Sequence, residues 1–492
     1  MNILLINPPD DNLIECYAYS NGEAGIDSPD FGKFPSLGLL YILGYLEKNA
    51  PEYNLFIIDC VAEKITYQEL KSKILKIRPD LVGITSFSIA LIDVIKTAGI
   101  VRELFPKAHI CMGGHHPMAF PAEALQLKEF DSIIVGDGEI PFYMLAKAIE
   151  KNKPLKDITG LYTKETIPAY MLENKCGKKE DSRFLYPVSL VPSYVENLDD
   201  LPFPSRKYLS HVQFFSIVGI SKKFTTVISS RGCPFHCVMC DVPYKKYRAR
   251  SIKNIADEIE ECVKEGYEEF HFYDDMFNIT PERIIEFSKE IMSRKLKIIW
   301  DFRGRVNTVT KESLEIAKKS GLRMISFGVE TGTNEGLRYI KKDTTVEKIK
   351  EVFQICSDLK IKTIADYMIG FPFEKTKRDI DESIKFCISI KPAYALFSVL
   401  ILFPNTPIYN EAAVKKLIDP ERWHKFCLNP SKDFYVDYWE EFFTRKQLLD
   451  FQKTAFRRFY LRLSYVLQSI KNISTFNEFL MKAKGCFLLL KK

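Results

Sequence analysis

Features that mark membrane, secreted and zinc-binding proteins are missing from this chain of 492 residues. No stretch approaches the roughly 18–20 consecutive apolar residues that a membrane-spanning helix needs. The segment from Met1 to Pro9 has no basic residues and only four apolar residues in a row, so we expect a first β-strand rather than a signal peptide. The twelve cysteines are too few for a disulfide scaffold of this length, which predicts a reducing cytoplasm.

The composition is that of a folded protein, with 46% apolar and 27% charged residues and no internal repeat or low-complexity run. Its length suggests about three domains. The net charge of +6 is uneven, because nine basic residues and only one acidic residue lie between Lys453 and Lys492. The positive charge therefore belongs to the C-terminal tail and not to the rest of the chain.

Three closely spaced cysteines are the most informative motif: Cys233, Cys237 and Cys240 have the spacing Cys-x3-Cys-x2-Cys. A cubane iron–sulfur cluster has four irons that are each held by a thiolate in ordinary ferredoxins. Three cysteines leave one iron open for a small molecule, so this motif predicts a cluster that binds and reduces a substrate.

The alternatives for this motif are a structural zinc site and three unrelated buried thiols. Zinc sites commonly use paired Cys-x2–4-Cys units and a fourth ligand, and no second pair is present. Unrelated thiols would not be expected in a Gly-Cys-Pro turn that follows the β-branched run Thr225 to Ile228. We therefore favour the cluster.

This triplet resembles the signature of radical S-adenosylmethionine (SAM) enzymes. In that family the open iron chelates SAM, and electron transfer cleaves SAM to a 5′-deoxyadenosyl radical. The position before the last cysteine is often aromatic in the family but is Met239 here, which can still pack on an adenine ring.

Two series of alternating strands and helices predict two α/β domains and a helical tail. Short apolar runs at 3–7, 55–59, 81–86, 109–114 and 132–136 are typical of a doubly wound, flavodoxin-like parallel sheet. Six further runs predict a partial (β/α)6 TIM-like barrel, with function at the strand carboxyl ends; they cover 224–230, 269–274, 298–303, 323–330, 362–369 and 396–402. The predicted parts are 1–150, a linker at 151–220, a radical SAM core at 221–431 and a helical region at 432–492.

Several strand-end residues resemble SAM contacts in the same family. Asp274 could accept the SAM ammonium, although a helix N-cap is an equal alternative for its neighbour Asp275. Arg303 could bind a carboxylate, or it could pair with Asp301 or Glu330. The SAM contacts that the resemblance implies are Phe235, Met239, Asp274, Arg303, Ser326, Glu330 and Gly370.

The N-terminal segment resembles the cobalamin-binding domain of one large radical SAM class, through Asn7-Pro8-Pro9, Gly113-Gly114-His115-His116 and Gly136-Asp137-Gly138-Glu139. A flavodoxin-like domain that binds nothing or a nucleotide is the alternative, but no Gly-x-Gly-x-x-Gly follows the first strand. The implied cobalamin contacts are Pro8, Ser36, Leu37, Thr85, Ser86, Gly113, Gly114, His115, His116, Gly136, Gly138 and Glu139. The Asp-x-His-x-x-Gly signature is absent, so the two histidines are interpreted as loop or propionamide contacts rather than cobalt ligands.

The resemblance implies an enzyme that uses a [4Fe-4S] cluster, SAM and cobalamin to methylate an unactivated carbon of a hydrophobic lipid or tetrapyrrole, with an electron donor such as flavodoxin or ferredoxin. Radical cyclisation without methyl transfer is the alternative, and the catalytic residues are not identified. A redox sensor and a methylthiotransferase acting on nucleic acid are less favoured, the latter because Cys16, Cys60 and Cys111 are too dispersed for a second triplet. We expect no nucleic-acid partner.

The basic and aromatic tail admits three interpretations. It could cap the barrel mouth, form a solvated helical face or rest on an anionic membrane through Phe456, Phe459, Tyr460 and Leu488 to Leu490. Membrane association of an otherwise cytoplasmic protein is therefore an expectation that depends on where these side chains lie.

Overall fold

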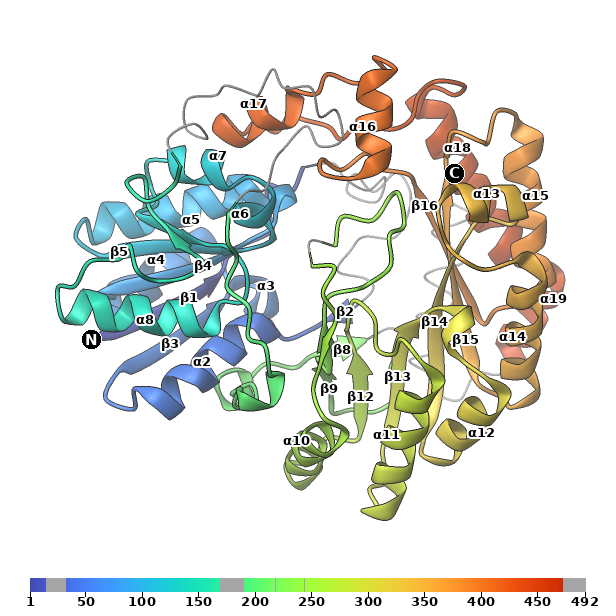
Figure 1. Cartoon of the computed structure of the whole chain (residues 1–492), viewed down its shortest axis with the longest axis horizontal. Helices are drawn as coiled ribbons and strands as arrows, with labels where there is room; N and C mark the ends of the chain where they lie inside the picture. The colour runs from blue at the N-terminus through green and yellow to red at the C-terminus, as the bar shows by residue number, and fades with distance from the viewer. Residues whose placement is uncertain (15–31, 169–189, 217, 243, 472–492) are drawn as a thin grey trace. The chain divides into compact units, whose positions relative to one another are not determined.

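The computed structural model describes residues 1–14, 32–168, 190–216, 218–242 and 244–471 (Figure 1). They divide into two compact units. The first contains residues 1–14, Phe34–Gln213 and Tyr409–Val436, and the second contains residues 32–33, Phe214–Ile408 and the described residues from Asp437 onward.

The first unit is built on a sheet with the strand order β3-β1-β4-β5-β6-β7. All neighbouring strands are parallel except β6 and β7. Its strands are β1 (Asn2–Asn7), β3 (Asn54–Asp59), β4 (Leu81–Ser86), β5 (His109–Gly114), β6 (Ser132–Ile134) and β7 (Leu161–Tyr162). The central strands are apolar at consecutive positions because helices cover both faces of a doubly wound sheet. The predicted flavodoxin-like fold is confirmed.

The helices of this unit follow the strands in alternation. Helix α2 packs against α8, and α4 packs against α5. They are α2 (Leu37–Asn49), α3 (Cys60–Glu63), α4 (Tyr67–Ile77), α5 (Leu91–Leu104), α6 (His115–Ala119), α7 (Pro121–Gln126) and α8 (Glu139–Glu150), with short 3-10 turns at Ser88–Ala90, Leu198–Asp200 and Arg206–Leu209.

Two segments lie in the first unit that the sequence did not place there. Strand β7, from the expected linker, adds an antiparallel edge to the sheet. Helix α17 (Arg422–Leu428), from the expected radical SAM core, packs on α7, where the Trp423 and Phe120 rings stack with centroids 6.0 Å apart. Trp423 is completely buried by this contact, which explains why residues 409–436 leave the second unit.

The second unit contains six parallel strands in the order β9-β12-β13-β14-β15-β16. They are β9 (Phe224–Val227), β12 (Glu269–Phe272), β13 (Ile299–Gly304), β14 (Leu322–Glu330), β15 (Lys362–Ile369) and β16 (Tyr394–Val399). Two small antiparallel pairs accompany them, β2 (Gly32–Lys33) with β8 (Phe215–Ser216) and β10 (Ser230–Arg231) with β11 (Arg248–Ala249). The predicted partial barrel is confirmed.

Helices cover the outer face of this curved sheet (Figure 1). They are α10 (Ile252–Lys264), α11 (Pro281–Ser293), α12 (Lys311–Lys319), α13 (Asn334–Tyr339), α14 (Val346–Asp358), α15 (Lys377–Ser389), α18 (Arg445–Tyr460) and α19 (Leu463–Lys471). Helix α16 (Pro407–Val414) follows the barrel in the sequence, and most of it belongs to the first unit. Ser251, Thr310 and Thr345 begin α10, α12 and α14, and each hydroxyl accepts a backbone N–H three residues later. Such caps fix where a helix begins.

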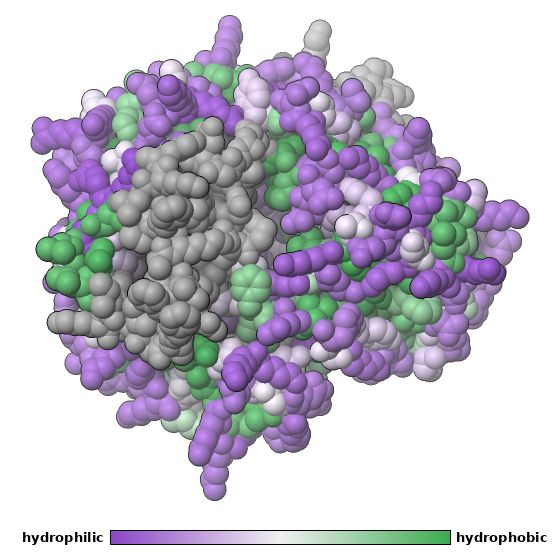
Figure 2. Space-filling view, turned by 180° about the vertical axis from the view of Figure 1, so that it is seen from behind, coloured by the Kyte–Doolittle hydropathy of each residue, from purple (hydrophilic) through white to green (hydrophobic). Residues whose placement is uncertain are grey.

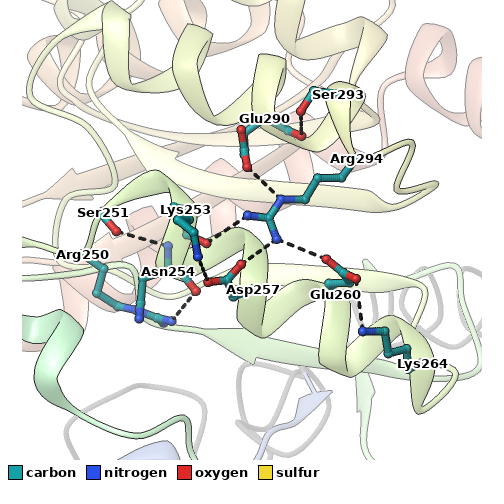
Figure 3. A network of polar contacts seen from close by, with 10 residues as sticks. All are labelled: Arg250, Ser251, Lys253, Asn254, Asp257, Glu260, Lys264, Glu290, Ser293 and Arg294. Atoms are coloured by element: carbon teal, nitrogen blue, oxygen red, sulfur yellow. Dashed lines mark hydrogen bonds and ion pairs between the residues drawn. The ribbon is translucent and has the colours of Figure 1, made fainter.

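Buried aromatic rings of the barrel and α11 pack together in the core of the second unit. Phe272, Phe277, Phe287, Trp300 and Phe302 are each at most 1% exposed, and neighbouring ring centroids lie 4.8–6.0 Å apart. Outside this core, Arg294 ties α11 to α10 by donating to Glu290, Asp257 and Glu260 (Figure 3). These partners raise the pKa of the guanidinium, against the effect of its partial burial.

The first part of the tail belongs to the core of the second unit. Phe456 and Phe459 on α18 are buried and contact the Phe397 ring of β16. The Tyr460 hydroxyl donates to the carbonyl oxygen of Ala395 at 2.9 Å, and Arg458 pairs with Asp381. These rings therefore do not form an exposed apolar face, which corrects the expected arrangement. Leu488 to Leu490 lie outside the described residues, and membrane contact stays a prediction.

Among the described residues, no helix is both long enough and apolar enough to cross a membrane. On the face shown in Figure 2, hydrophobic residues are interspersed among hydrophilic ones.

Gly321, which precedes β14, gives a test of this fold. It has φ +102°, and a Cβ atom there would lie 1.9 Å from the Ile298 carbonyl oxygen. Gly266 also has positive φ, but a Cβ atom there meets nothing within 4 Å. We expect Gly266→Ala to lower the free energy of unfolding by about 1–2 kcal/mol and Gly321→Ala by about 3 kcal/mol or more. Chemical denaturation measures both, and equal losses would contradict the close approach.

Candidate functional sites

The three cysteines lie on one loop that starts just after β9. The loop is held by the β10–β11 pair and by a hydrogen bond from the Cys233 N–H to the Tyr244 carbonyl oxygen at 2.9 Å. Gly232 makes this path possible, because it has φ +84° and a Cβ atom there would lie 2.4 Å from the Lys246 carbonyl oxygen. The chain therefore turns tightly immediately before the first cysteine.

The thiols of Cys233, Cys237 and Cys240 are free and partly exposed. Burial raises the pKa of Cys233 and Cys240, while nearby positive charge, from Lys245 for both and Arg305 for Cys233, lowers it. An iron ligand has to be a thiolate, and adjacent cations favour that form. Three accessible thiols on one loop beside positive charge fit the ligand set of an iron–sulfur cluster.

Two adjacent carboxylates after β12 accept hydrogen bonds from the start of this loop. Asp274 accepts the Ser229 and Ser230 N–H groups at 2.6 and 3.1 Å and the Ser229 hydroxyl at 2.5 Å, and Asp275 accepts the Gly232 N–H at 3.0 Å. Burial raises the pKa of Asp274 to about 6 despite these bonds. Both oxygens of Asp274 are therefore engaged with the loop, and the structure gives it a positioning role in place of an open ammonium acceptor. A contact of Asp274 with SAM stays a prediction.

The other predicted SAM contacts lie on the barrel strands of the second unit or on the cysteine loop. Arg303 is exposed above the Tyr273 ring, 5.1 Å from its centroid, and forms no ion pair within 4.0 Å in the described structure. Ser326 donates to Asp366 at 2.8 Å. On the loop, Phe235 is partly exposed and Met239 is buried.

Glu330 and Lys342 form a buried ion pair of 2.8 Å at the end of β14. A Cβ atom on Gly328 would lie 2.4 Å from the Glu330 carboxylate and 2.6 Å from the Lys342 ammonium, so Gly328 makes room for the pair. Glu330 also has φ +69°, an uncommon conformation for a residue other than glycine. Such local strain is typical of functional sites.

The turn after β15 is organised by Glu374. Its carboxylate accepts the Gly370 and Phe371 N–H groups at 2.7 and 3.1 Å, and burial raises its pKa to about 7. Gly370 has φ +96°, as this turn requires. Gly370 and Glu374 are the first and last residues of the Gly-x-Pro-x-Glu segment that suggested Gly370 as a SAM contact, and the contact with SAM stays a prediction.

In the first unit, the predicted cobalamin contacts gather at the carboxyl edge of the sheet. Ser36 donates to the Asp59 carboxylate at 2.5 Å, and the Asn7 amide donates to the same carboxylate at 2.8 Å. Pro8 and Leu37 are buried beside them. These hydrogen bonds join the ends of β1 and β3 to the start of α2. The Ser36 hydroxyl is therefore already bound to the Asp59 carboxylate.

There is free space at the carboxyl ends of β4 and β5, at the position of Gly113. Thr85 pairs with Gly113 and Ser86 with Gly114 across the two strands. A Cβ atom on Gly113 would meet nothing within 4 Å, whereas one on Gly114 would lie 2.7 Å from the Ser86 carbonyl oxygen. The buried Ser86 hydroxyl has no hydrogen-bond partner among the described residues. The position of Gly113 therefore leaves space at this edge, and the unpaired Ser86 hydroxyl is a separate polar group at the same strand ends.

The two histidines beside this edge differ in environment. His116 is completely buried, its Nδ1 lies 3.0 Å from the Ser88 hydroxyl, and burial lowers its pKa to about 3. His115 is exposed and stacks on the Phe87 ring at 5.3 Å. The remaining predicted contacts, Gly136, Gly138 and Glu139, lie at the start of α8, where Gly136 contacts the Ser193 backbone closely.

Two family matches agree with these two sites. Residues 31–146 match the B12 binding domain and residues 227–387 match the radical SAM superfamily. The chain is 28% identical over 478 residues to the uncharacterized methyltransferase PH0819 of Pyrococcus horikoshii, covering 96% of this chain and 95% of that protein. It is 25% identical over 500 residues to the anaerobic magnesium-protoporphyrin IX monomethyl ester cyclase of Rubrivivax gelatinosus, covering 99% and 82%.

Solved structures share the fold. The cobalamin-dependent SAM radical enzyme OxsB superposes with a TM-score of 0.69 at 16% identity, covering 99% of this chain and 71% of that chain. The methyltransferase TsrM from Kitasatospora setae, with cobalamin and a [4Fe-4S] cluster bound, gives a TM-score of 0.63 at 17% identity, covering 84% and 74%. The two family matches confirm the predicted cofactors, because a radical SAM domain implies the cluster and SAM and a B12 binding domain implies cobalamin.

Cobalamin is expected to bind to this protein without a histidine on cobalt. His116 is buried and held by Ser88, and no described histidine belongs to an Asp-x-His-x-x-Gly segment. Electron paramagnetic resonance of the cob(II)alamin-loaded protein should lack the nitrogen superhyperfine splitting of an axial imidazole. The His115→Ala protein should give the same spectrum, and a splitting that disappears in this variant would contradict the expectation.

Proposed function

Because the chain belongs to the cobalamin-dependent radical SAM enzymes, we propose that it methylates an unactivated carbon of a hydrophobic substrate, either a lipid or a tetrapyrrole. The observation that carries the proposal is the match to a protein named a methyltransferase along almost the whole of both chains. A hydrophobic substrate is supported by matches to the hopanoid C-3 methylase of Methylococcus capsulatus and the bacteriochlorophyllide d C-12(1)-methyltransferase of Chlorobaculum tepidum.

In this proposal the two sites bind different cofactors. When bound, the cluster and SAM supply a hydrogen-abstracting radical, and cobalamin supplies a carrier for the methyl group. The three cysteines hold the cluster, and Asp274 and Asp275 fix the loop that carries them. At the other site, Gly113 leaves room for a flat ligand and Ser86 offers it a hydroxyl. The single electron comes from a donor protein of the flavodoxin or ferredoxin class.

Radical ring closure without methyl transfer is the second candidate. It is supported by the match to the magnesium-protoporphyrin IX monomethyl ester cyclase, which also covers nearly the whole chain. The residues that hold the three cofactors would be the same for both reactions. The two candidates therefore differ in the product and not in the ligand set.

Comparative extraction separates these candidates. A strain that lacks the gene is compared with strains that carry the intact gene or the Cys233→Ala gene, all grown anaerobically with methionine labelled in its methyl group. If the protein is a methyltransferase, the deletion strain and the Cys233→Ala strain should accumulate a lipid or pigment that is one methylene lighter than the product of the intact strain. The product of the intact strain should carry the label. An unlabelled product of different unsaturation would favour ring closure. Identical lipid and pigment profiles would argue against a hydrophobic substrate.

Assay of the purified protein excludes a sensor that binds SAM without turnover. The reconstituted enzyme, reduced with dithionite, is expected to form 5′-deoxyadenosine in excess over enzyme when a crude lipid and pigment extract from the deletion strain is added. An amount that never exceeds one per cluster would favour the sensor.

A further inference from the structure

Arg305 lies beside the cysteine loop, directly after β13. Its Nη1 atom is 3.2 Å from the Cys237 sulfur, and its guanidinium lies over the Phe235 ring, 4.0 Å from the centroid. Its Nη2 atom donates to the Lys342 carbonyl oxygen. The residue is only 5% exposed, so the side chain is fixed with one N–H edge directed at a sulfur of the triplet.

Among the described residues, no buried carboxylate balances the charge of Arg305. The closest acidic oxygen that pairs with it belongs to Asp343, at 3.8 Å, on a side chain that is 68% exposed. Two other arginines of the same unit show the usual arrangement, since Arg250 pairs with the fully buried Glu258 and Arg323 with the fully buried Glu269. A buried cation is costly unless it is paired, so Arg305 requires a further negative group.

An unpaired nitrogen supports the same conclusion. The Nε atom of Arg305 is buried and has no hydrogen-bond partner among the described residues. A guanidinium has five N–H donors and no acceptor, so each donor needs an anion, a carbonyl oxygen or a sulfur. The Nη1 atom donates to the Cys237 sulfur, and this thiol becomes an anion when it binds iron.

We propose that the iron–sulfur cluster is the counter-charge of Arg305, and that Arg305 raises the reduction potential of the cluster by donating a hydrogen bond to the Cys237 thiolate. Reduction adds one electron from an external donor and no proton. The added negative charge is stabilised by a fixed cation that solvent does not screen, and hydrogen bonds to cluster sulfurs shift the potential in the same direction. The proposal rests on the three cysteine ligands and does not depend on the identity of the substrate.

Arg305 acts in this proposal as a positioning and tuning residue, because it acts through Cys237. Its function differs from that of Arg303, two residues earlier, which is exposed over Tyr273 and has no contact with a cysteine in the described structure. The pair Arg303 and Arg305 therefore places one guanidinium toward solvent and the other toward the cluster loop.

The test is a reductive titration of the anaerobically reconstituted full-length protein, followed by electron paramagnetic resonance, with iron and sulfide counted in each sample. Arg305→Met should move the midpoint potential to more negative values, and Arg305→Lys, which keeps the charge but loses the planar fork, should lie between Arg305→Met and the unmodified protein. Arg378→Met is the matched control, because it removes the same charge from a side chain that is 86% exposed. Its potential should not change.

An unchanged midpoint potential in Arg305→Met, at full iron content, would overturn the proposal, and so would a shift no larger than that of Arg378→Met. If Arg305→Met loses iron while Arg305→Lys keeps it, the charge is needed to retain the cluster and the counter-charge assignment is supported. Loss of iron from both variants would overturn the tuning role and leave Arg305 as a purely structural residue.

Discussion

The Cys233→Ala, Cys237→Ala and Cys240→Ala proteins are each expected to lose the iron–sulfur cluster after anaerobic reconstitution, and with it all formation of 5′-deoxyadenosine. The reason is that three thiolates on one loop already leave one iron without a protein ligand, so a further loss leaves two irons unsupported. The measurements are iron and sulfide content, the visible absorption of the cluster and the yield of 5′-deoxyadenosine.

The control for this result uses cysteines of the second unit that are outside the loop. Cys262 on α10 and Cys356 on α14 are buried in helix–sheet packing, and Cys387 on α15 has the same setting. Replacing Cys262 or Cys356 by alanine removes one buried sulfur atom and should cost about 1 kcal/mol of stability, with iron content unchanged. Cys387 and Cys427, the latter in the first unit, should be equally dispensable for iron. A full cluster in the triple variant of Cys233, Cys237 and Cys240 would refute the assignment.

The strands and helices of both sheets could be predicted because their signals are local. Short apolar runs separated by helix-length polar segments identify parallel strands, and threonines such as Thr310 and Thr345 mark where helices begin. The position of residues 409–436 could not be predicted in the same way. It depends on the packing of Trp423 against Phe120, which is a contact between residues about 300 positions apart.

The tail shows a related limit of sequence interpretation. Aromatic residues between basic residues on α18 have the composition of a membrane-binding helix, but the same pattern suits a helix that covers a strand. Phe456 and Phe459 face β16, and Arg458 reaches Asp381 at the edge of the contact. Hydrophobic periodicity shows that one face of a helix is covered, and it does not identify the partner.

In the candidate cluster site, the residues that bind the cofactor could be predicted better than the residues that contact and position them. The cysteine triplet is a strong local pattern, whereas the contact of Arg305 with Cys237 joins a loop to a strand 68 residues later. Asp274 was found from its place at a strand end, but its hydrogen bonds to Ser229 and Ser230 require the neighbouring strand. The position of a residue at a strand end therefore predicts that it lies near the site, but it does not predict what the residue does there.

Replacement of Gly113 by leucine is expected to weaken cobalamin binding without unfolding the protein. Among the described residues, a Cβ atom at Gly113 meets no atom within 4 Å, so a side chain can leave the backbone there without a clash at its first atom. A bound corrin at this edge would need the same space, and overpacking of a close contact costs typically about 1–3 kcal/mol. That cost corresponds to a loss of affinity of about 5- to 150-fold, measured by equilibrium dialysis of cobalamin against the full-length protein.

Gly99→Leu is the matched control for this experiment, because a Cβ atom at Gly99 also meets nothing within 4 Å but Gly99 lies within α5, away from the carboxyl ends of the strands. It should bind cobalamin like the unmodified protein, and both variants should keep their unfolding temperature. Gly114→Ala should behave differently, since φ +92° and the Ser86 carbonyl oxygen at 2.7 Å oppose any side chain, and should lower stability as well as binding. Unchanged affinity of the Gly113→Leu protein would show that cobalamin does not lie against the ends of β4 and β5.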